Sequence, residues 1–184
     1  MIDLEKMARG ADEYTSIDTT GVLQRQAVRV VAATGMVAAA WLLLIISPSL
    51  LHAAGHASAG SSVFSFFGYI CHQIPERSFF AFGHQFGVCS RCFAVYAGLF
   101  AAVVAYPLWR SVENIEPLPR IWLLLSAVPM AIDWALTVFG IWENNFFTRT
   151  LTGLILGFAC GTYILPALVE ITRNFRPPAR RAAA

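Results

Sequence analysis

Four long apolar stretches limit what this chain can fold into more than any other feature of its sequence. The hydrocarbon core of a bilayer is about 30 Å thick, and about 20 helical residues cross it. Stretches of roughly this length occupy residues 28–46, 92–109, 121–141 and 151–171. Strands standing alone in hydrocarbon would leave backbone groups without hydrogen bonds, so each stretch must be helical. The sequence therefore predicts an all-α integral membrane bundle of four transmembrane helices.

Composition agrees with a membrane protein and excludes two other classes. Only 13% of the 184 residues are charged, and the mean hydropathy is +0.60. A disordered chain would need low hydrophobicity and high charge. A net charge of +2 is too small for the basic surface of an ordinary nucleic-acid-binding protein. We expect membrane lipids as partners and no nucleic acid, and other membrane-protein subunits stay open as a further class of partner.

The distribution of Lys and Arg predicts how the chain is oriented. If it starts in the cytoplasm, ten of its thirteen Lys and Arg residues fall inside, and only Arg77, Arg91 and Arg149 fall outside. By the positive-inside rule both termini are cytoplasmic, in a multi-pass protein of the cell (inner) membrane. The predicted parts are a cytoplasmic tail or short surface helix, a four-span domain and a second cytoplasmic tail. They comprise residues 1–27, 28–171 and 172–184.

Small residues recur every fourth position on three of the predicted spans. The three sets are Ala94, Gly98 and Ala102; Ala127, Ala131 and Ala135; and Gly153, Gly157 and Gly161. This spacing places each set on one helix face, where two backbones can approach closely. We expect these faces to pack helices of the chain against one another, with docking of another subunit as the alternative.

The segment between the first two spans is too long for a simple connector. Pro48 is expected to end the first helix, because its ring cannot continue one. Residues 48–62 are rich in Ala, Gly and Ser, so we expect them to be flexible, with His52 and His56 free in water. Eight of the fourteen Phe residues follow within residues 64–93. Four apolar residues there have helical spacing: Val63, Phe66, Phe67 and Ile70. We predict a re-entrant or interfacial aromatic segment between the first two spans.

A string of candidate metal ligands lies in the same segment. Three thiols and two imidazoles fall within twenty-two residues, and they are Cys71, His72, His84, Cys89 and Cys92. Cys89 and Cys92 are three residues apart at the start of the second span, so on a helix both sulfurs point to one side. This spacing suits tetrahedral zinc, with Cys71 and either His72 or His84 completing a Cys₃His set. We expect one zinc ion or another transition-metal ion here.

The same thiols allow other interpretations. An oxidising outer compartment would let two of the three form a structural disulfide. A Cys-x-x-Cys pair at a helix N-terminus can also be redox-active, because the thiolate is favoured there. Phe93 stands where a covalent c-type haem site needs a His, so that site is excluded. Cys160 lies in the middle of the fourth span and is interpreted as a small packing residue.

A second polar group is predicted on the same face of the membrane. Asp133 lies in the outer third of the third span, where a carboxylate is costly and must find a partner. The topology joins it to other polar residues in a predicted network. The network consists of Gln73, Arg77, Arg91, Asp133, Glu143, Asn145 and Arg149. Its simplest role is a structural ion pair of Asp133 with Arg149 or Arg91, and acid–base chemistry is the alternative.

These residues resemble the signature of a known family. The runs that carry the likeness are Cys71-His72-Gln73-Ile74-Pro75-Glu76-Arg77-Ser78-Phe79-Phe80, Phe82-Gly83-His84-Gln85 and Val88-Cys89-Ser90-Arg91-Cys92, followed by Asp133, Glu143, Asn145, Arg149, Thr152 and Gly153. They resemble domain of unknown function 2085, a family of predicted multi-span prokaryotic membrane proteins, over residues 64–166. Ala94 and Trp134 stand where the family usually has Gly. The resemblance implies that Cys71, His72, Cys89 and Cys92 form one site, and it assigns no activity.

Three functions follow as hypotheses. The first is a small polytopic membrane protein with a Cys/His metal or disulfide site on its outer face. The second is an accessory or scaffold subunit of a larger membrane complex, such as an electron-transfer complex. The third is an enzyme, either a membrane thiol oxidoreductase or a hydrolase using Asp133, Glu143 and His72. No phosphate loop, nucleophile elbow or zinc-protease helix is present in the sequence, so whether the protein is an enzyme stays open.

Overall fold

The computed structural model confirms the four-helix membrane bundle. It describes residues 4–112, 114, 116 and 118–175, with side chains from residue 21 onward. Within this part of the chain, four helices are long and apolar enough to cross a membrane. They are the stretch Gly21–Ala53 of α1 (Leu4–Ala53), α3 (Ser90–Trp109), α4 (Arg120–Val138) and α5 (Phe146–Asn174). The helix of the first span therefore includes residues 4–27 of the segment expected to be a tail or a short surface helix.

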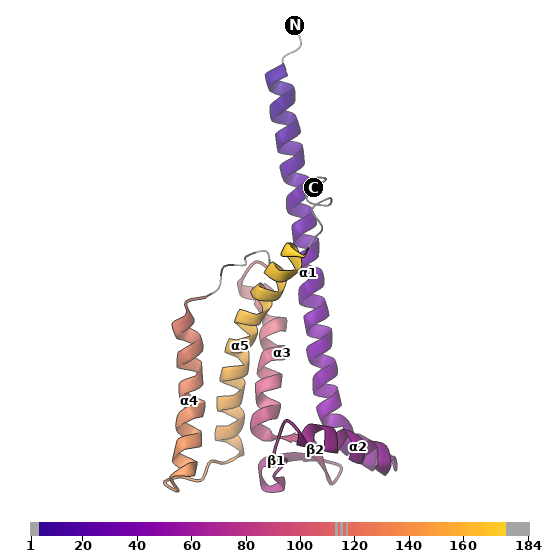
Figure 1. The fold of residues 1–184 in the computed structure, drawn as a ribbon, viewed down its shortest axis with the longest axis vertical. Helices are drawn as coiled ribbons and strands as arrows, with labels where there is room; N and C mark the ends of the chain where they lie inside the picture. Colours follow the sequence, from indigo (N-terminus) through magenta and orange to yellow (C-terminus); the bar gives the residue numbers. More distant parts are fainter. Residues whose placement is uncertain (1–3, 113, 115, 117, 176–184) are drawn as a thin grey trace.

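The four helices run alternately up and down (Figure 1). α1 descends to α2 (Ala57–Gly68), the short 3₁₀ helix η1 (Pro75–Arg77) and the strands β1 (Ser78–Ala81) and β2 (His84–Cys89). α3 then ascends, α4 descends and α5 ascends again, so the α4–α5 turn lies at the same end as the two strands. We call this the hairpin end of the bundle. α5 packs against α3 and α4, and α1 packs against α3 and α5.

Pro48 does not end the first helix, contrary to the sequence prediction. α1 continues through it to Ala53. A proline lacks the N–H that would bond to the carbonyl four residues earlier, here that of Leu44. The Ser47 hydroxyl donates a hydrogen bond to that carbonyl oxygen at 2.8 Å. Because the side chain satisfies the freed acceptor, the helix can continue at membrane depth.

The prediction of a flexible segment after residue 48 was also wrong. A tight turn with Gly55 at φ +82° connects α1 to α2, and α2 begins at Ala57. His52 is not free in water, because its ring stacks on that of His84 with the centroids 5.2 Å apart. A Cβ on Gly60 would lie 2.7 Å from the ring of His52, so a larger residue there would require the ring to shift. His56 is exposed.

The aromatic segment contains a β-hairpin that the sequence analysis did not predict. β1 and β2 pair antiparallel, with Ala81 opposite His84 and an irregular register between Ser78 and Phe80. Phe82 and Gly83 form the two-residue turn, at φ +54° and +78°. Positive φ at both positions is the geometry of a tight hairpin turn of type I′. The hairpin carries the chain from Cys71 back to Cys89 at the start of α3.

The contact between α3 and α5 confirms the predicted close packing of small residues. An added Cβ on Gly98 would lie 2.5 Å from the backbone oxygen of Leu154. One on Gly161 would lie 2.6 Å from the Cβ of Ala102. The two backbones therefore touch along the faces predicted from the four-residue spacing. α4 has no buried residue, and Ala131 of its small-residue face is exposed, so the third face does not pack in this way.

Replacing Gly157 tests this contact. A Cβ there would overlap the backbone oxygen and carbonyl carbon of Val95, neither of which can move without shifting α3. We expect Gly157→Leu to lower the free energy of unfolding by about 3 kcal/mol or more, since overpacking forces backbone shifts. The measurement is thermal unfolding of the purified protein in detergent.

The matched control is Gly35→Ala in α1. A Cβ at Gly35 meets only the Val103 side chain at 3.6 Å, which is ordinary van der Waals contact. We expect this variant to unfold at the wild-type temperature or slightly above it, because alanine favours helix over glycine. Equal melting temperatures for Gly157→Leu and the wild type would contradict the packing role of the α3–α5 contact.

Candidate metal centre

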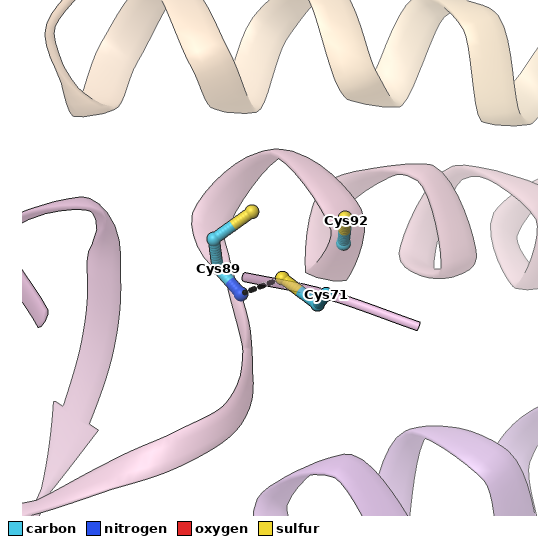
Figure 2. Close-up of side chains that lie close together, drawn as sticks. All are labelled: Cys71, Cys89 and Cys92. Carbon is cyan, nitrogen blue, oxygen red and sulfur yellow. Dashed lines mark hydrogen bonds between the residues drawn. The ribbon is translucent and has the colours of Figure 1, made fainter. Parts of the chain in front are cut away.

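The three thiols of the aromatic segment come together at the hairpin end. Cys71 lies in the loop after α2, Cys89 ends β2, and Cys92 lies in the first turn of α3. Figure 2 shows their side chains around a common space. All three sulfur atoms lie within 4.8 Å of one another, and none is in a disulfide. Cys71 thus joins two cysteines that lie eighteen and twenty-one positions later in the sequence, and we call the group the three-thiol cluster.

The apolar core at the hairpin end holds Cys71 in place. Cys71 is buried together with Ile45 of α1, Phe67 of α2 and Val88 of β2. Its sulfur accepts a hydrogen bond from the backbone N–H of Cys89 at 3.2 Å, drawn as the dashed line in Figure 2. Since these contacts come from three different elements, the cluster depends on the packing of the whole hairpin end.

Two glutamines fix the loop that carries Cys71. The side-chain amide of Gln73 donates to the backbone oxygens of Phe64 and Gly87, at 2.7 and 2.8 Å. The amide of Gln85 donates to the backbone oxygen of Gln73 at 2.8 Å and to the hydroxyl of Ser78 at 2.9 Å. Gln73 has φ +50°, a conformation that most residues avoid and that these hydrogen bonds stabilise.

The chemistry of the cluster suits a soft or borderline metal ion. Sulfur ligands at about 2.3 Å from a tetrahedral zinc ion lie about 3.8 Å from one another, so small side-chain shifts would close the cluster on a metal. The metal ligand is the thiolate rather than the thiol. The pKa of Cys89 lies well below its usual range, because the side chain of Cys71 and then that of Cys92 donate hydrogen bonds to its sulfur. Of the three sulfurs, that of Cys89 is therefore the one that most readily becomes a thiolate.

The three-thiol cluster faces a pocket of about 350 Å³. Besides the thiols, it is lined by His72 and Gln73, by three arginines, and by Trp134 of α4. The arginines are Arg77 after η1, Arg91 of α3 and Arg149 of α5. The pocket thus brings the three-thiol cluster together with residues of α4 and α5. The topology predicted from the sequence places these residues on the same face of the membrane. Of the two histidines considered as ligands, His72 is exposed at this pocket.

Asp133 forms an ion pair with Arg91, which links α4 to the start of α3. Their side chains are 9% and 17% exposed. The amide of Asn144 donates to the Asp133 carboxylate at 2.9 Å, and its side-chain oxygen accepts a hydrogen bond from Arg149. Of the two ion pairs considered from sequence, the structure contains the one with Arg91, and Asn144 connects Asp133 to Arg149.

Three sequence-predicted residues lie apart from the cluster. His84 stacks on His52, and it is not part of the group of candidate ligands, which contains only the three cysteines. Glu143 is exposed in the α4–α5 turn. Asn145 caps α5, where its side-chain oxygen accepts from the backbone N–H of Thr148 at 2.9 Å. The sequence analysis did not include Gln85 in the network, because its role depends on the pairing of β1 with β2.

This architecture defines a small polytopic membrane protein with three thiols and three arginines at one end of its bundle. The chain belongs to DUF2085, a family described as predicted membrane proteins, whose family model matches residues 71–163, half of the chain. The family expected from the sequence motifs is therefore confirmed. The match begins at Cys71 and includes every residue of the three-thiol cluster.

Two archaeal proteins are similar to this chain. The uncharacterized protein MJ1492 of Methanocaldococcus jannaschii is 37% identical over 110 residues, which are 59% of this chain and 70% of that protein. An uncharacterized protein of Methanothermobacter thermautotrophicus is 38% identical over 105 residues, or 56% of this chain and 93% of that protein. No solved structure matches the fold.

Asp133→Asn tests whether the ion pair is structural. The amide keeps the shape of the side chain but leaves the mostly buried Arg91 without a counter-charge. We expect the free energy of unfolding to fall by about 1–3 kcal/mol, the usual cost of leaving a buried polar group unsatisfied. Thermal unfolding in detergent measures it, with Glu143→Gln as the control because that carboxylate is exposed nearby. An unchanged melting temperature for Asp133→Asn would refute a structural role.

Proposed function

We propose that this protein is a membrane-embedded metal-binding module in which Cys71, Cys89 and Cys92 hold one zinc ion or another transition-metal ion. The observation that carries the proposal is the approach of three unbridged sulfurs to within 4.8 Å of one another. The lowered pKa of Cys89 supports it, because metal binding requires the thiolate. Thiolate ligands favour zinc, copper(I) and iron–sulfur chemistry among the biological metals.

The fourth coordination position decides what such a metal can do. His72 lies at the same pocket and is the candidate for a fourth protein ligand, whereas the contact of His84 with His52 makes it the weaker one. Four protein ligands would make the site closed and structural. Three would leave a position open to the pocket, as in catalytic zinc sites.

The redox interpretation of the same thiols is the second candidate. Its support is also the low pKa of Cys89, since a thiolate near a second thiol can form and exchange disulfides. It differs from the metal proposal in needing no ion at the cluster. The scaffold hypothesis has less support, because the exposed apolar residues of the four spans suit contact with lipid equally well.

Elemental analysis of the purified protein tests the metal site. We expect about one equivalent of a transition metal in the wild type and less than about a tenth of that in Cys89→Ser and Cys92→Ser, because a hydroxyl is a poor ligand for soft metals. The control is Cys160→Ser in α5, since Cys160 is not part of the three-thiol cluster and is expected to keep the metal.

Metal-free wild-type protein would overturn the metal proposal. In that case, maleimide labelling in cells distinguishes the remaining interpretations. Labelling of Cys89 that changes with the redox state of the cell would support redox cycling, and thiols that are always oxidised would leave a structural disulfide.

We also propose that the hairpin end faces outward and that both termini are cytoplasmic in the cell (inner) membrane. The support is the excess of Lys and Arg in the segments at the other end of the bundle. We expect a fluorescent protein that folds only in the cytoplasm to be bright when fused to the C-terminus and dark when inserted at the exposed hairpin turn, Phe82-Gly83. The reverse pattern would contradict this orientation.

A further inference from the structure

The pocket beside the three-thiol cluster is rich in positive charge. Three guanidinium groups line it, and among the described residues no carboxylate does. Two of the three are engaged with other side chains, Arg91 with Asp133 and Arg149 with Asn144. The side chain of Arg77 is exposed and has neither a hydrogen bond nor an ion pair to any residue in the described part of the chain. Its donors are available to a ligand.

The charges around the pocket do not cancel. A divalent metal bound by three thiolates carries one net negative charge, and the ion charge must be counted in such a site. Asp133 adds one negative charge beside Arg91. Against the three arginines, these two negative charges leave the pocket with one net positive charge.

Two of the three arginines are largely buried, and this burial makes the excess positive charge costly. Arg149 is only 7% exposed. The Nε of Arg91 is buried and has no hydrogen-bond partner in the described structure. Buried cations are normally paired, and a buried donor without a partner calls for a ligand or ordered water. An anion in the pocket would supply both the missing charge and acceptor oxygens.

We propose that this pocket binds a phosphate group, whose oxygens accept hydrogen bonds from Arg77 beside the three-thiol cluster. A guanidinium matches a phosphate with two parallel N–H donors, which makes arginine the usual residue for such recognition. The residues that line the pocket belong to the hairpin end of the bundle, where both free phosphate and lipid headgroups are within reach. The proposal deepens the proposed metal centre and rests on it for the state of the thiols, whereas the buried Nε of Arg91 lacks a hydrogen-bond partner whether or not a metal is bound.

Equilibrium dialysis of the purified protein in detergent against radiolabelled inorganic phosphate is the first test. We expect the wild type to bind phosphate and Arg77→Gln to bind it about tenfold more weakly, since a hydrogen bond to a charged group is lost. The control is Arg120→Gln at the start of α4, an exposed arginine at the other end of the bundle. It makes the same change in net charge and is expected to leave binding unchanged.

Phosphorus analysis of the washed protein distinguishes the two sources of phosphate. If a lipid headgroup fills the pocket, the wild type retains phosphorus that Arg77→Gln loses, and free phosphate binds only after the lipid is removed. If free phosphate is the ligand, washing removes it and dialysis restores it. Equal binding and equal retained phosphorus in the wild type and Arg77→Gln would overturn the proposal.

Metal content measured on the same samples separates this proposal from the metal centre. Because Arg77 is not part of the three-thiol cluster, Arg77→Gln is expected to keep the wild-type metal content. Phosphate binding without metal in any sample would reject the metal centre and leave the phosphate site in place. Metal in every sample without phosphate binding or retained phosphorus would reject the phosphate site and leave the metal centre in place.

Discussion

The contact between α3 and α5 determines where the parts of the candidate site lie. The glycines of α5 let its backbone touch that of α3, and the contact reaches the first turn of α3. A Cβ on Gly153 would lie 2.7 Å from the backbone oxygen of Arg91. Arg149 lies one turn before Gly153, so it is held beside Arg91 and Cys92. The α5 side of the pocket therefore depends on backbone contact without intervening side chains.

The other side of the pocket depends on hydrogen bonds at the end of the bundle. Residues 71–74 lie in neither a helix nor a strand, yet Cys71 must lie against α3. Gln73 and Gln85 supply side-chain amides for the carbonyl oxygens of this region, and Ser78 closes the network through the carbonyl of Ile74 at 2.8 Å. Buried polar groups satisfied in this way specify one arrangement of the chain. This hydrogen-bond network therefore holds the sulfur of Cys71 in the loop against those of Cys89 and Cys92 at the start of α3.

Much of the fold follows from sequence because hydrocarbon allows few alternatives. Apolar length predicts the four spans, and the four-residue spacing of small residues predicts the α3–α5 contact. What could not be predicted depends on partners distant in sequence. Phe82-Gly83 is not a typical hairpin dipeptide, so the hairpin became visible only with the pairing of Ala81 and His84. Pro48 misled because the hydroxyl of Ser47, one residue earlier, takes the place of its missing donor.

The three thiols of the candidate site could be predicted from the sequence, whereas the contacts of the surrounding residues could not. Clustering of Cys and His in sequence identified the three thiols, and topology placed Asp133 and Arg149 on the same face. The choice between His72 and His84 required knowing that His52, at the end of a helix expected to stop earlier, contacts His84. Asp133 similarly takes Arg91 because α4 packs beside α5 at the level of the first turn of α3. Side-chain chemistry predicts only the kind of residue with which each group pairs, such as an arginine for an aspartate. Helix packing determines which residue of that kind it contacts. The placement of three thiols and three arginines around a single pocket is thus a consequence of how the helices pack.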